Sequence, residues 1–290
     1  MGLTEIDFTG CPRVPGRAYN GANGKKIAVS FQGATWLLKF PPPTGDRPTE
    51  LSYSNSCFSE HLGSTVFRLL GVPAQETRLG THLNGHRKVV CACRDFTVPG
   101  KRLYDFCSIK NSVIDSETGG MGTELDDVLQ TIDLQTFMDP VAVRRWFWEM
   151  FVVDALLGNF DRHNGNWGFL VDEATNAVSL APVFDCGSCL LPQADETVMR
   201  KVLADEAELD ARIYTFPASM LKRNGRKIGY ADFLRDSPDP DFRAAYDRLL
   251  PRIAELDVDG LLGSTPYLGD LQRSFLSVYL RARRSRLFGC

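Results

Sequence analysis

The sequence lacks the features that mark membrane proteins and proteins with a strong electrostatic partner. It has no apolar run of about 18 residues, the length that a helix needs to cross a bilayer. The 33 Lys and Arg residues nearly balance the 36 Asp and Glu residues, leaving a net charge of −3. This composition provides no global attraction to nucleic acid or to an anionic membrane. We therefore expect neither nucleic acid nor a membrane as a partner.

Cysteine is also scarce, and no leader sequence is evident. Eight cysteines in 290 residues are too few for a disulfide framework. The start, MGLTEID, is polar and acidic, unlike a secretory signal peptide. We expect free thiols and a cytoplasmic location, with secretion as an effector without a recognisable signal as the alternative. The 43% of hydrophobic residues are enough to form a substantial core.

The first hundred residues predict a small, strand-rich lobe. Runs rich in β-forming residues flank Gln32-Gly33, a typical hairpin turn. A helix follows, begun by Ser56 as its cap and ended by Gly71. The expected strands cover residues 25–31, 35–40, 76–79 and 87–93, and the expected helix covers residues 58–70.

From residue 101 onward the pattern favours helices. The strongest one, at residues 141–157, carries apolar side chains at helical spacing. Residues 111–122 indicate a mobile loop because they contain little that could be buried. The basic tail at 281–286 favours a solvated helix C-terminus. We expect an α+β protein with an N-lobe at 1–98 and a C-lobe at 99–290, with further helices at 196–209, 241–255 and 268–287 and a strand at 178–183.

A polar turn after the helix at 141–157 carries the side chains of greatest chemical interest. Asp161 and Asn166 lie five positions apart, and Asp185 follows behind another apolar run. Transfer of a phosphoryl group requires a base beside the acceptor hydroxyl and oxygen ligands for Mg²⁺. Asp161 fits the base, and Asn166 and Asp185 fit the metal ligands. His163 could donate a hydrogen bond to a phosphate oxygen. An ATP- and Mg²⁺-dependent kinase is therefore the leading hypothesis.

Two segments upstream could contact the phosphates of ATP. Lys39 ends an expected strand, and Glu60, in the first turn of the next helix, is its natural partner. Glycine-containing residues 19–25 could bring backbone N–H groups close to phosphate, since glycine permits close approach. An ordinary hairpin turn is the alternative for that segment. The candidate phosphate-binding residues there are Gly21, Ala22, Asn23, Gly24 and Lys25.

Two cysteine pairs have the spacing of a tetrahedral zinc site. They are Cys91 with Cys93, and Cys186 with Cys189. The first pair would lie near the junction of the lobes and the second beside Asp185. Packing thiols are the preferred interpretation, and zinc is the alternative.

Together these residues resemble the HipA-like serine/threonine kinases, and most closely the short CtkA-like branch. The resemblance runs from about Tyr19 to Phe233, and its most specific parts are GNFDRHNGNWG at 158–168 and APVFDCGS at 181–188. It implies a bilobal protein-kinase-like fold, ATP and Mg²⁺, and a protein substrate with a Ser or Thr acceptor. It also implies a hinge near 91–96, where the backbone of Cys91 and Cys93 would hold adenine.

Two departures from the family pattern limit what the resemblance implies. Ala18 stands where HipA toxins have a serine that they phosphorylate themselves, so that inactivation switch is in doubt. The chain also has no room for the additional N-terminal subdomain of HipA, which puts docking of an antitoxin-like regulator in question. Autophosphorylation and a toxin or effector role remain open.

Two other functions compete with a protein kinase. Asp-Arg-His followed by Asn also resembles the catalytic loop of phosphoinositide kinases, for which the acceptor is a lipid. A nucleotide-binding interaction module without turnover is the second alternative.

Overall fold

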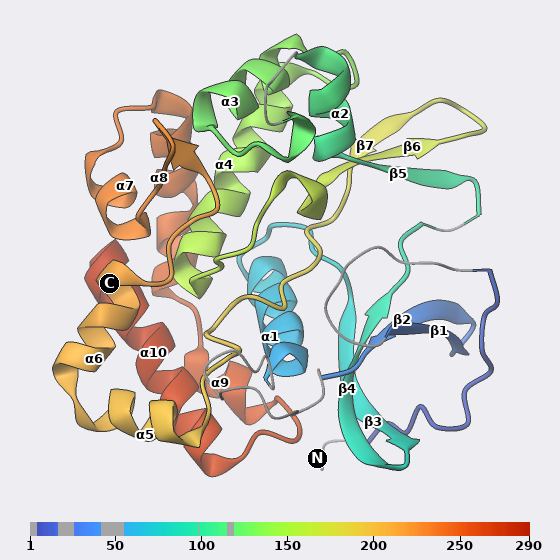
Figure 1. Ribbon diagram of the computed structural model, residues 1–290, viewed down its shortest axis with the longest axis vertical. Helices are drawn as coiled ribbons and strands as arrows, with labels where there is room; N and C mark the ends of the chain where they lie inside the picture. Colours follow the sequence, from blue (N-terminus) through green and yellow to red (C-terminus); the bar gives the residue numbers. More distant parts are fainter. Residues whose placement is uncertain (1–4, 17–25, 42–54, 98, 115–118) are drawn as a thin grey trace.

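The computed structural model describes residues 5–16, 26–41, 55–97, 99–114 and 119–290. Its N-terminal part is a four-stranded antiparallel sheet in the order β1-β2-β4-β3, with helix α1 packed on it (Figure 1). Both residues of the first hairpin turn, Gln32 and Gly33, have positive φ, the backbone of a tight two-residue turn. The elements are β1 (Lys26–Phe31), β2 (Ala34–Lys39), α1 (Ser56–Leu69), β3 (Thr77–Asn84) and β4 (His86–Arg94).

Helix α1 begins and ends differently from a simple capped helix. Its N-cap is Asn55, so the prediction that Ser56 caps the helix was wrong. The Asn55 side chain donates to the carbonyl of Ala194 instead of bonding its own helix. At the other end Gly71 has φ +80°, as predicted for a terminating glycine, and Arg252 donates to the carbonyl of Leu70 over 2.8 Å.

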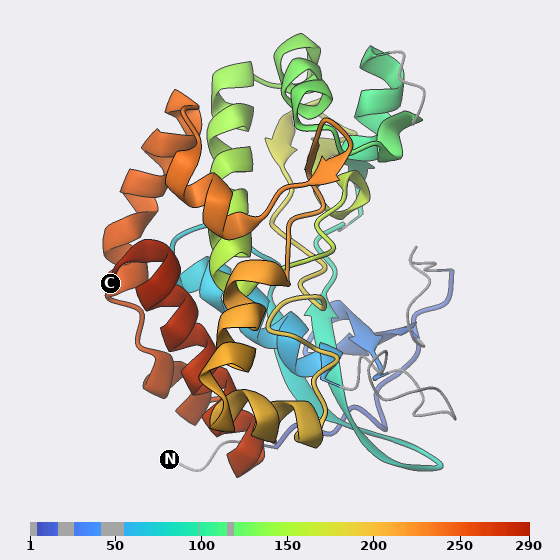
Figure 2. The same ribbon diagram turned by 60° about the vertical axis from the view of Figure 1, so that its left-hand side comes forward.

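The C-terminal part is mainly helical, with small sheets at one end (Figures 1 and 2). Strands β5, β6 and β7 form one sheet, and β8 and β9 form a separate hairpin. The longer helices are α2 (Phe106–Val113), α3 (Leu125–Leu134), α4 (Pro140–Leu157), α5 (Glu196–Ala204), α8 (Pro240–Ala254) and α10 (Asp270–Phe288). The shorter elements are β5 (Lys101–Asp105), η2 (Gly119–Met121), η3 (Asn164–Asn166), β6 (Gly168–Asp172), β7 (Val178–Leu180), α6 (Glu206–Asp210), η4 (Ala211–Thr215), β8 (Lys222–Arg223), β9 (Arg226–Lys227), α7 (Tyr230–Asp236) and α9 (Val258–Gly263).

Helix α4 is the centre of this part and confirms the helix predicted at 141–157. From Trp146 to Leu157 almost every residue is buried, which explains why apolar residues surround the helix on all sides. Gly158 ends it with φ +64°. A side chain at this position would collide with Tyr279 and Pro217, so glycine is required both by backbone conformation and by space. The polar turn starts directly after this glycine.

Several predicted boundaries in the C-terminal part were wrong. The loop expected at 111–122 belongs to α2 as far as Val113, and Gly120 is buried against Cys107. The helix expected at 196–209 is broken at Asp205, whose side chain accepts from the N–H of Ala207 and starts α6. The strand expected at 178–183 ends at Leu180.

The basic tail is not a solvated helix end throughout, as the sequence had suggested. Arg283 is fully buried, and its Nε donates to the carbonyls of Ala155 at 3.1 Å and Leu156 at 3.0 Å. The carbonyl groups at the C-terminus of α4 have no partners within their own helix, and Arg283 satisfies them. Within the described residues, no helix has both the length and the apolar character for a bilayer crossing.

Candidate active site

Lys39 joins the two parts of the molecule. Its Nζ lies 2.8 Å from Glu60 Oε2 on α1 and 2.8 Å from Asp185 Oδ1 in the segment after β7. Burial alone would lower the pKa of Lys39, but the charges of Asp185 and Glu60 outweigh it and hold that pKa well above its usual value. The ammonium group is therefore charged and held in place. The predicted pair of Lys39 and Glu60 is present, together with a third member, Asp185.

The backbone brings Asp185 to this position in an unusual conformation. Asp185 has φ +56°, in the left-handed region that few non-glycine residues adopt. Gly187 follows, and a Cβ there would lie 3.2 Å from Glu60 Oε2, so the absence of a side chain lets this segment approach the carboxylate. Lys39 lowers the pKa of Asp185 to about 2. Asp185 is thus ionised at neutral pH.

The polar turn at 158–166 is built around a buried ion pair. Arg162 Nε lies 2.9 Å from Asp154 Oδ2, and both side chains are almost fully buried. Asp154 also accepts from Asn159 Nδ2 at 2.8 Å, and Asn159 Oδ1 accepts from the N–H of Asp161 at 3.0 Å. Because a buried charge requires full pairing, Asp154 holds the Asn159 side chain, and Asn159 in turn holds the backbone of Asp161. The α4 carboxylate therefore determines the position of Asp161.

Arg162 also holds the two predicted metal ligands near each other. Its Nη1 donates to the carbonyl of Asn166 at 3.0 Å and to the carbonyl of Phe184, the residue before Asp185. The Asn166 side chain in turn donates to the carbonyl of Asp161 at 3.0 Å. A single guanidinium group thus connects the polar turn to the Asp185 segment.

Asp161 and Asp185 lie close enough to influence each other electrostatically. Burial raises the pKa of Asp161, and the negative charge of Asp185 raises it further, while His163, Arg162 and Lys227 oppose this effect. A carboxylate with a raised pKa is a stronger proton acceptor than an ordinary surface aspartate.

The residues at this place fit Mg²⁺ by their chemistry. Asn166 offers an amide oxygen and Asp185 a carboxylate, both hard ligands of the type that Mg²⁺ prefers. With a nucleotide, Mg²⁺ needs only one or two protein ligands, because phosphates and water complete its coordination. The pair of side chains is therefore sufficient in kind for a metal that arrives with ATP.

His163 occupies the same turn but has a clear local task. Its Nδ1 accepts from the N–H of Gly165 at 3.0 Å and caps the short helix η3. The predicted hydrogen bond to a phosphate would have to use the other ring nitrogen.

The predicted phosphate-binding loop lies outside the described residues, whereas the predicted hinge lies within them. Gly21, Ala22, Asn23, Gly24 and Lys25, like Ala18, lie outside the described residues. Cys91 and Cys93 are inside the central strand β4, where both are paired with β2 on one side and β3 on the other. The chain leaves the sheet only after Arg94. The backbone that connects the two lobes is therefore formed by the residues after Arg94.

The cysteine pairs pack in separate places. Cys91 and Cys93, with sulfurs 4.0 Å apart, share a small cluster with Cys57 under the sheet, whereas Cys186 and Cys189 belong to the large core of the helical part. Within the described ranges, no group of three or more His, Cys, Asp or Glu side chains is placed to hold a metal ion. The zinc alternative finds no support in this arrangement.

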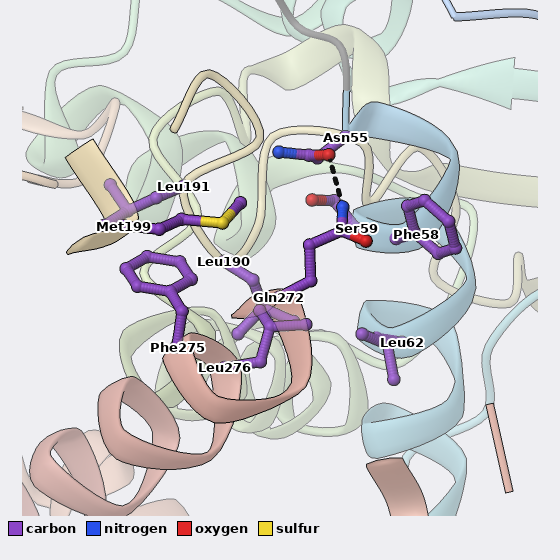
Figure 3. Close-up of a pocket in the computed structure, with 10 residues that line it drawn as sticks. All are labelled: Asn55, Phe58, Ser59, Leu62, Leu190, Leu191, Met199, Gln272, Phe275 and Leu276. Atoms are coloured by element: carbon purple, nitrogen blue, oxygen red, sulfur yellow. Dashed lines mark hydrogen bonds between the residues drawn. The ribbon is translucent and has the colours of Figure 1, made fainter. Parts of the chain in front are cut away.

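A small pocket lies elsewhere, between α1, the segment at 190–191, α5 and α10 (Figure 3). Its cavity of about 10 Å³ has room for about one water molecule. Gln272 Nε2 donates to Asn55 Oδ1 across its edge at 2.7 Å. None of the predicted site residues lines it. The pocket lies where these elements pack against one another, and it is too small for a nucleotide.

The sequence analysis did not identify the buried residues that hold the polar turn and the end of α4 in place. Asp154, Arg162, Tyr230 and Arg283 are all nearly or fully buried. Tyr230 donates to the carbonyl of Asn159, and Arg283 holds the end of α4. The available signal was Asp154, a carboxylate within the apolar run at residues 150–157 of α4, since such a charge is rarely buried without a partner.

Comparisons with known proteins identify the family and the fold of this chain. The HipA-like C-terminal domain family matches residues 18–236. The serine/threonine-protein kinase CtkA of Helicobacter pylori (strain J99 / ATCC 700824) is 45% identical over 286 residues, which cover 98% of this chain and 87% of that protein. The crystal structure of a Helicobacter pylori proinflammatory kinase CtkA is similar with a TM-score of 0.91 and 44% identity, over 99% of this chain and 96% of that one. They confirm the predicted α+β kinase fold with a small sheet-rich part and a helical part. The chain therefore belongs to the HipA-like family, as its motifs predicted, and it resembles CtkA along nearly its whole length.

Proposed function

We propose that this chain, as a member of the serine/threonine protein kinases, transfers the γ-phosphoryl group of ATP to a Ser or Thr hydroxyl of a protein with the help of Mg²⁺. The observation that carries the proposal is the placement of Lys39 Nζ, 2.8 Å from both Glu60 and Asp185. A charged ammonium group beside a metal-binding carboxylate is what a bound triphosphate requires.

Each residue has a distinct part in this proposal. Lys39 pairs with the phosphates and Glu60 holds Lys39 in position. Asn166 and Asp185 would hold Mg²⁺, which would neutralise the charge that develops on the transferred group. Asp161 accepts or orients the proton of the acceptor hydroxyl, supported by its raised pKa. His163 contributes to phosphate binding through Nε2, the ring nitrogen that does not cap η3.

The proposal includes phosphorylation of the chain itself. Incubation of the purified protein with radiolabelled ATP and Mg²⁺, alone and with a mixture of generic protein substrates, tests both activities. Mass spectrometry then locates any phosphate on the chain.

Asp161→Asn is the decisive variant, and Asp126→Asn, an exposed carboxylate on α3, is the matched control. We expect label on Ser or Thr of protein with the unaltered chain and the control, and labelling slower by about 100-fold or more with Asp161→Asn. Equal labelling by Asp161→Asn would remove that residue from its role. Label on inositol lipid but not on protein would favour a lipid kinase, and binding of ATP without loss of its γ-phosphate would favour a non-catalytic module.

A further inference from the structure

The β8–β9 hairpin carries an unusual concentration of positive charge. Its six residues are Lys-Arg-Asn-Gly-Arg-Lys at 222–227. Lys222 is paired with Lys227 and Arg223 with Arg226, so like charges face each other across the ladder. Like charges directly opposite each other destabilise a strand pair, so the hairpin carries this charge at a cost in stability.

Most of these charges are exposed. Arg226 and Lys227 are exposed and Lys222 is partly so. Within the described part of the chain no ion pair involves these three residues. Arg223 differs, since its guanidinium lies 5.5 Å from the ring of Phe233. By contrast Arg235, on the following helix α7, pairs with two carboxylates of its own helix.

One carboxylate lies at the tip of the hairpin, but it has a structural task. Glu124 Oε1 accepts from the N–H of Gly225 at 2.8 Å and holds the turn. With four positive charges against this one negative charge, the hairpin remains strongly cationic.

The hairpin is anchored next to the catalytic turn. The N–H of Lys222 donates to the carbonyl of Thr123 at 2.8 Å. The segment just before Thr123 contacts the turn directly, because Asn164 Nδ2 donates to the carbonyls of Gly120 at 2.7 Å and Gly122 at 2.8 Å. The buried Lys110 secures the same segment with a hydrogen bond of 3.0 Å to Gly122.

The other end of the hairpin leads to the same turn. Tyr230, three residues after Lys227, donates its hydroxyl to the carbonyl of Asn159. Lys227 is moreover one of the cations that act electrostatically on Asp161. Both figures show the hairpin beside the start of α3, at the opposite end of the helical part from α5 (Figures 1 and 2).

From this placement we infer that the hairpin is the binding surface for the protein substrate, and that it selects acceptor segments with Asp or Glu close to the phosphorylated Ser or Thr. The inference rests on the proposed function for the identity of the acceptor. The hairpin stands beside the residue that would accept the hydroxyl proton, so a polypeptide that reaches Asp161 passes near its cations. Complementary charge at such a rim chiefly gives specificity and faster association.

A kinetic experiment with synthetic peptides tests the selectivity. Three peptides carry one Ser each in a neutral sequence and differ only in having Glu, Ala or Lys at the flanking positions. For the unaltered chain we expect kcat/KM to be about tenfold higher for the Glu peptide than for the Ala peptide at low salt, and the difference to shrink in about 0.5 M salt.

The variants are Lys222→Gln, Arg226→Gln and Lys227→Gln combined, with Arg200→Gln and Lys201→Gln on α5 combined as the control. The hairpin variant should lose the preference for Glu through a higher KM for the peptide, while KM for ATP stays the same. The α5 control should keep it. A circular dichroism spectrum and an unfolding midpoint confirm that both variants fold.

A binding experiment separates this inference from the proposed activity. Peptides with Ala in place of Ser carry a fluorophore, and their affinity is measured by anisotropy without turnover. The Glu peptide should bind several-fold more tightly than the Ala peptide, and only the hairpin variant should lose the difference.

Several results would overturn the inference even if the chain is an active kinase. These are equal binding of the Glu and Ala peptides, preference for the Lys peptide, tighter binding of an oligonucleotide of equal charge, or a hairpin variant altered only in KM for ATP. Failure of phosphate transfer to every acceptor would instead count against the proposed function. The binding experiment would then decide whether the hairpin selects acidic peptides.

Discussion

Lys39 Nζ on β2 lies 2.8 Å from Asp185 Oδ1, although 146 positions separate these residues in the sequence. The contact connects the sheet-rich part of the molecule to the segment after β7. It is also the most direct sign that the predicted phosphate-binding and metal-binding residues converge at one place.

Replacing Lys39 should abolish phosphate transfer. In Lys39→Met, Asp185 and Glu60 lose their shared cation, and the site loses the charge that would pair with the nucleotide. We expect the rate of label transfer from ATP to fall by about 100-fold or more. Lys88→Met, on the neighbouring strand β4, is the matched control and should keep nearly full activity. A Lys39→Met protein that is as active as the control would show that another group binds the phosphates.

Activity should decline on the acid side because of Asp161. Its pKa is raised by burial, so as the pH falls the carboxylate is protonated earlier than an ordinary aspartate and can no longer accept a proton. A plot of kcat/KM against pH should therefore fall below a midpoint higher than that of a free carboxyl group. Asp161→Asn should lower kcat by roughly 100-fold to 10,000-fold and flatten this limb. An unchanged acid limb in the residual activity would assign it to a different group.

Breaking the buried pair of Asp154 and Arg162 should be costly for stability. Arg162→Met leaves the Asp154 carboxylate buried without its cation, a loss of about 3–5 kcal/mol in the free energy of unfolding. Arg200→Ala breaks an exposed pair with Glu196 and should cost less than about 1 kcal/mol. Denaturant unfolding of the two variants provides the comparison. Similar losses for both would mean that the buried pair contributes no more than a surface pair.

The stability of the fold should depend on His61 between neutral and acid pH. His61 Nδ1 lies 3.0 Å from Thr77 Oγ1, and burial lowers the pKa of this imidazole from 6.5 to about 4. Between these values the unfolded chain binds more protons than the folded one, so stability decreases as the pH falls from about 6.5 to about 4. His61→Gln should show a smaller decrease over this range, whereas His86→Gln, at the exposed start of β4, should follow the unaltered chain. Identical curves for all three proteins would contradict the assignment to His61.

The sequence allowed the fold class, the family and the main residues of the site to be predicted. Asp161, Asn166 and Asp185 belong to short motifs in which polar residues follow apolar segments, and Lys39 and Glu60 belong to elements with clear periodicity. The family and the α+β fold are confirmed, whereas the roles of these residues and the lobe limits at 1–98 and 99–290 stay predictions.

What could not be predicted depends on contacts between distant segments. β5 and β6 pair with each other, with residue 105 opposite residue 168 at one end of the register. Neither segment has a sequence pattern that predicts a strand by itself, so only the pairing reveals them. The burial of Arg283 likewise depends on the end of α4, 127 positions away, and nothing in the sequence separates it from the neighbouring arginines of the tail, which are half-buried or exposed. The hinge near residues 91–96 stays a prediction, but the sequence alone did not show that Cys91 and Cys93 lie inside β4, since only the register shows how far this strand extends.

The role of Arg283 has a practical consequence for work with shortened proteins. The match to the family ends at residue 236, yet α10, which carries this arginine, begins at Asp270. A fragment cut at the family boundary would leave the carbonyls of Ala155 and Leu156 without these donors, two residues ahead of Gly158, where the polar turn begins. Inactivity of such a fragment would reflect the loss of the Arg283 contacts that hold the end of α4. It would carry no information about the chemistry of the site residues.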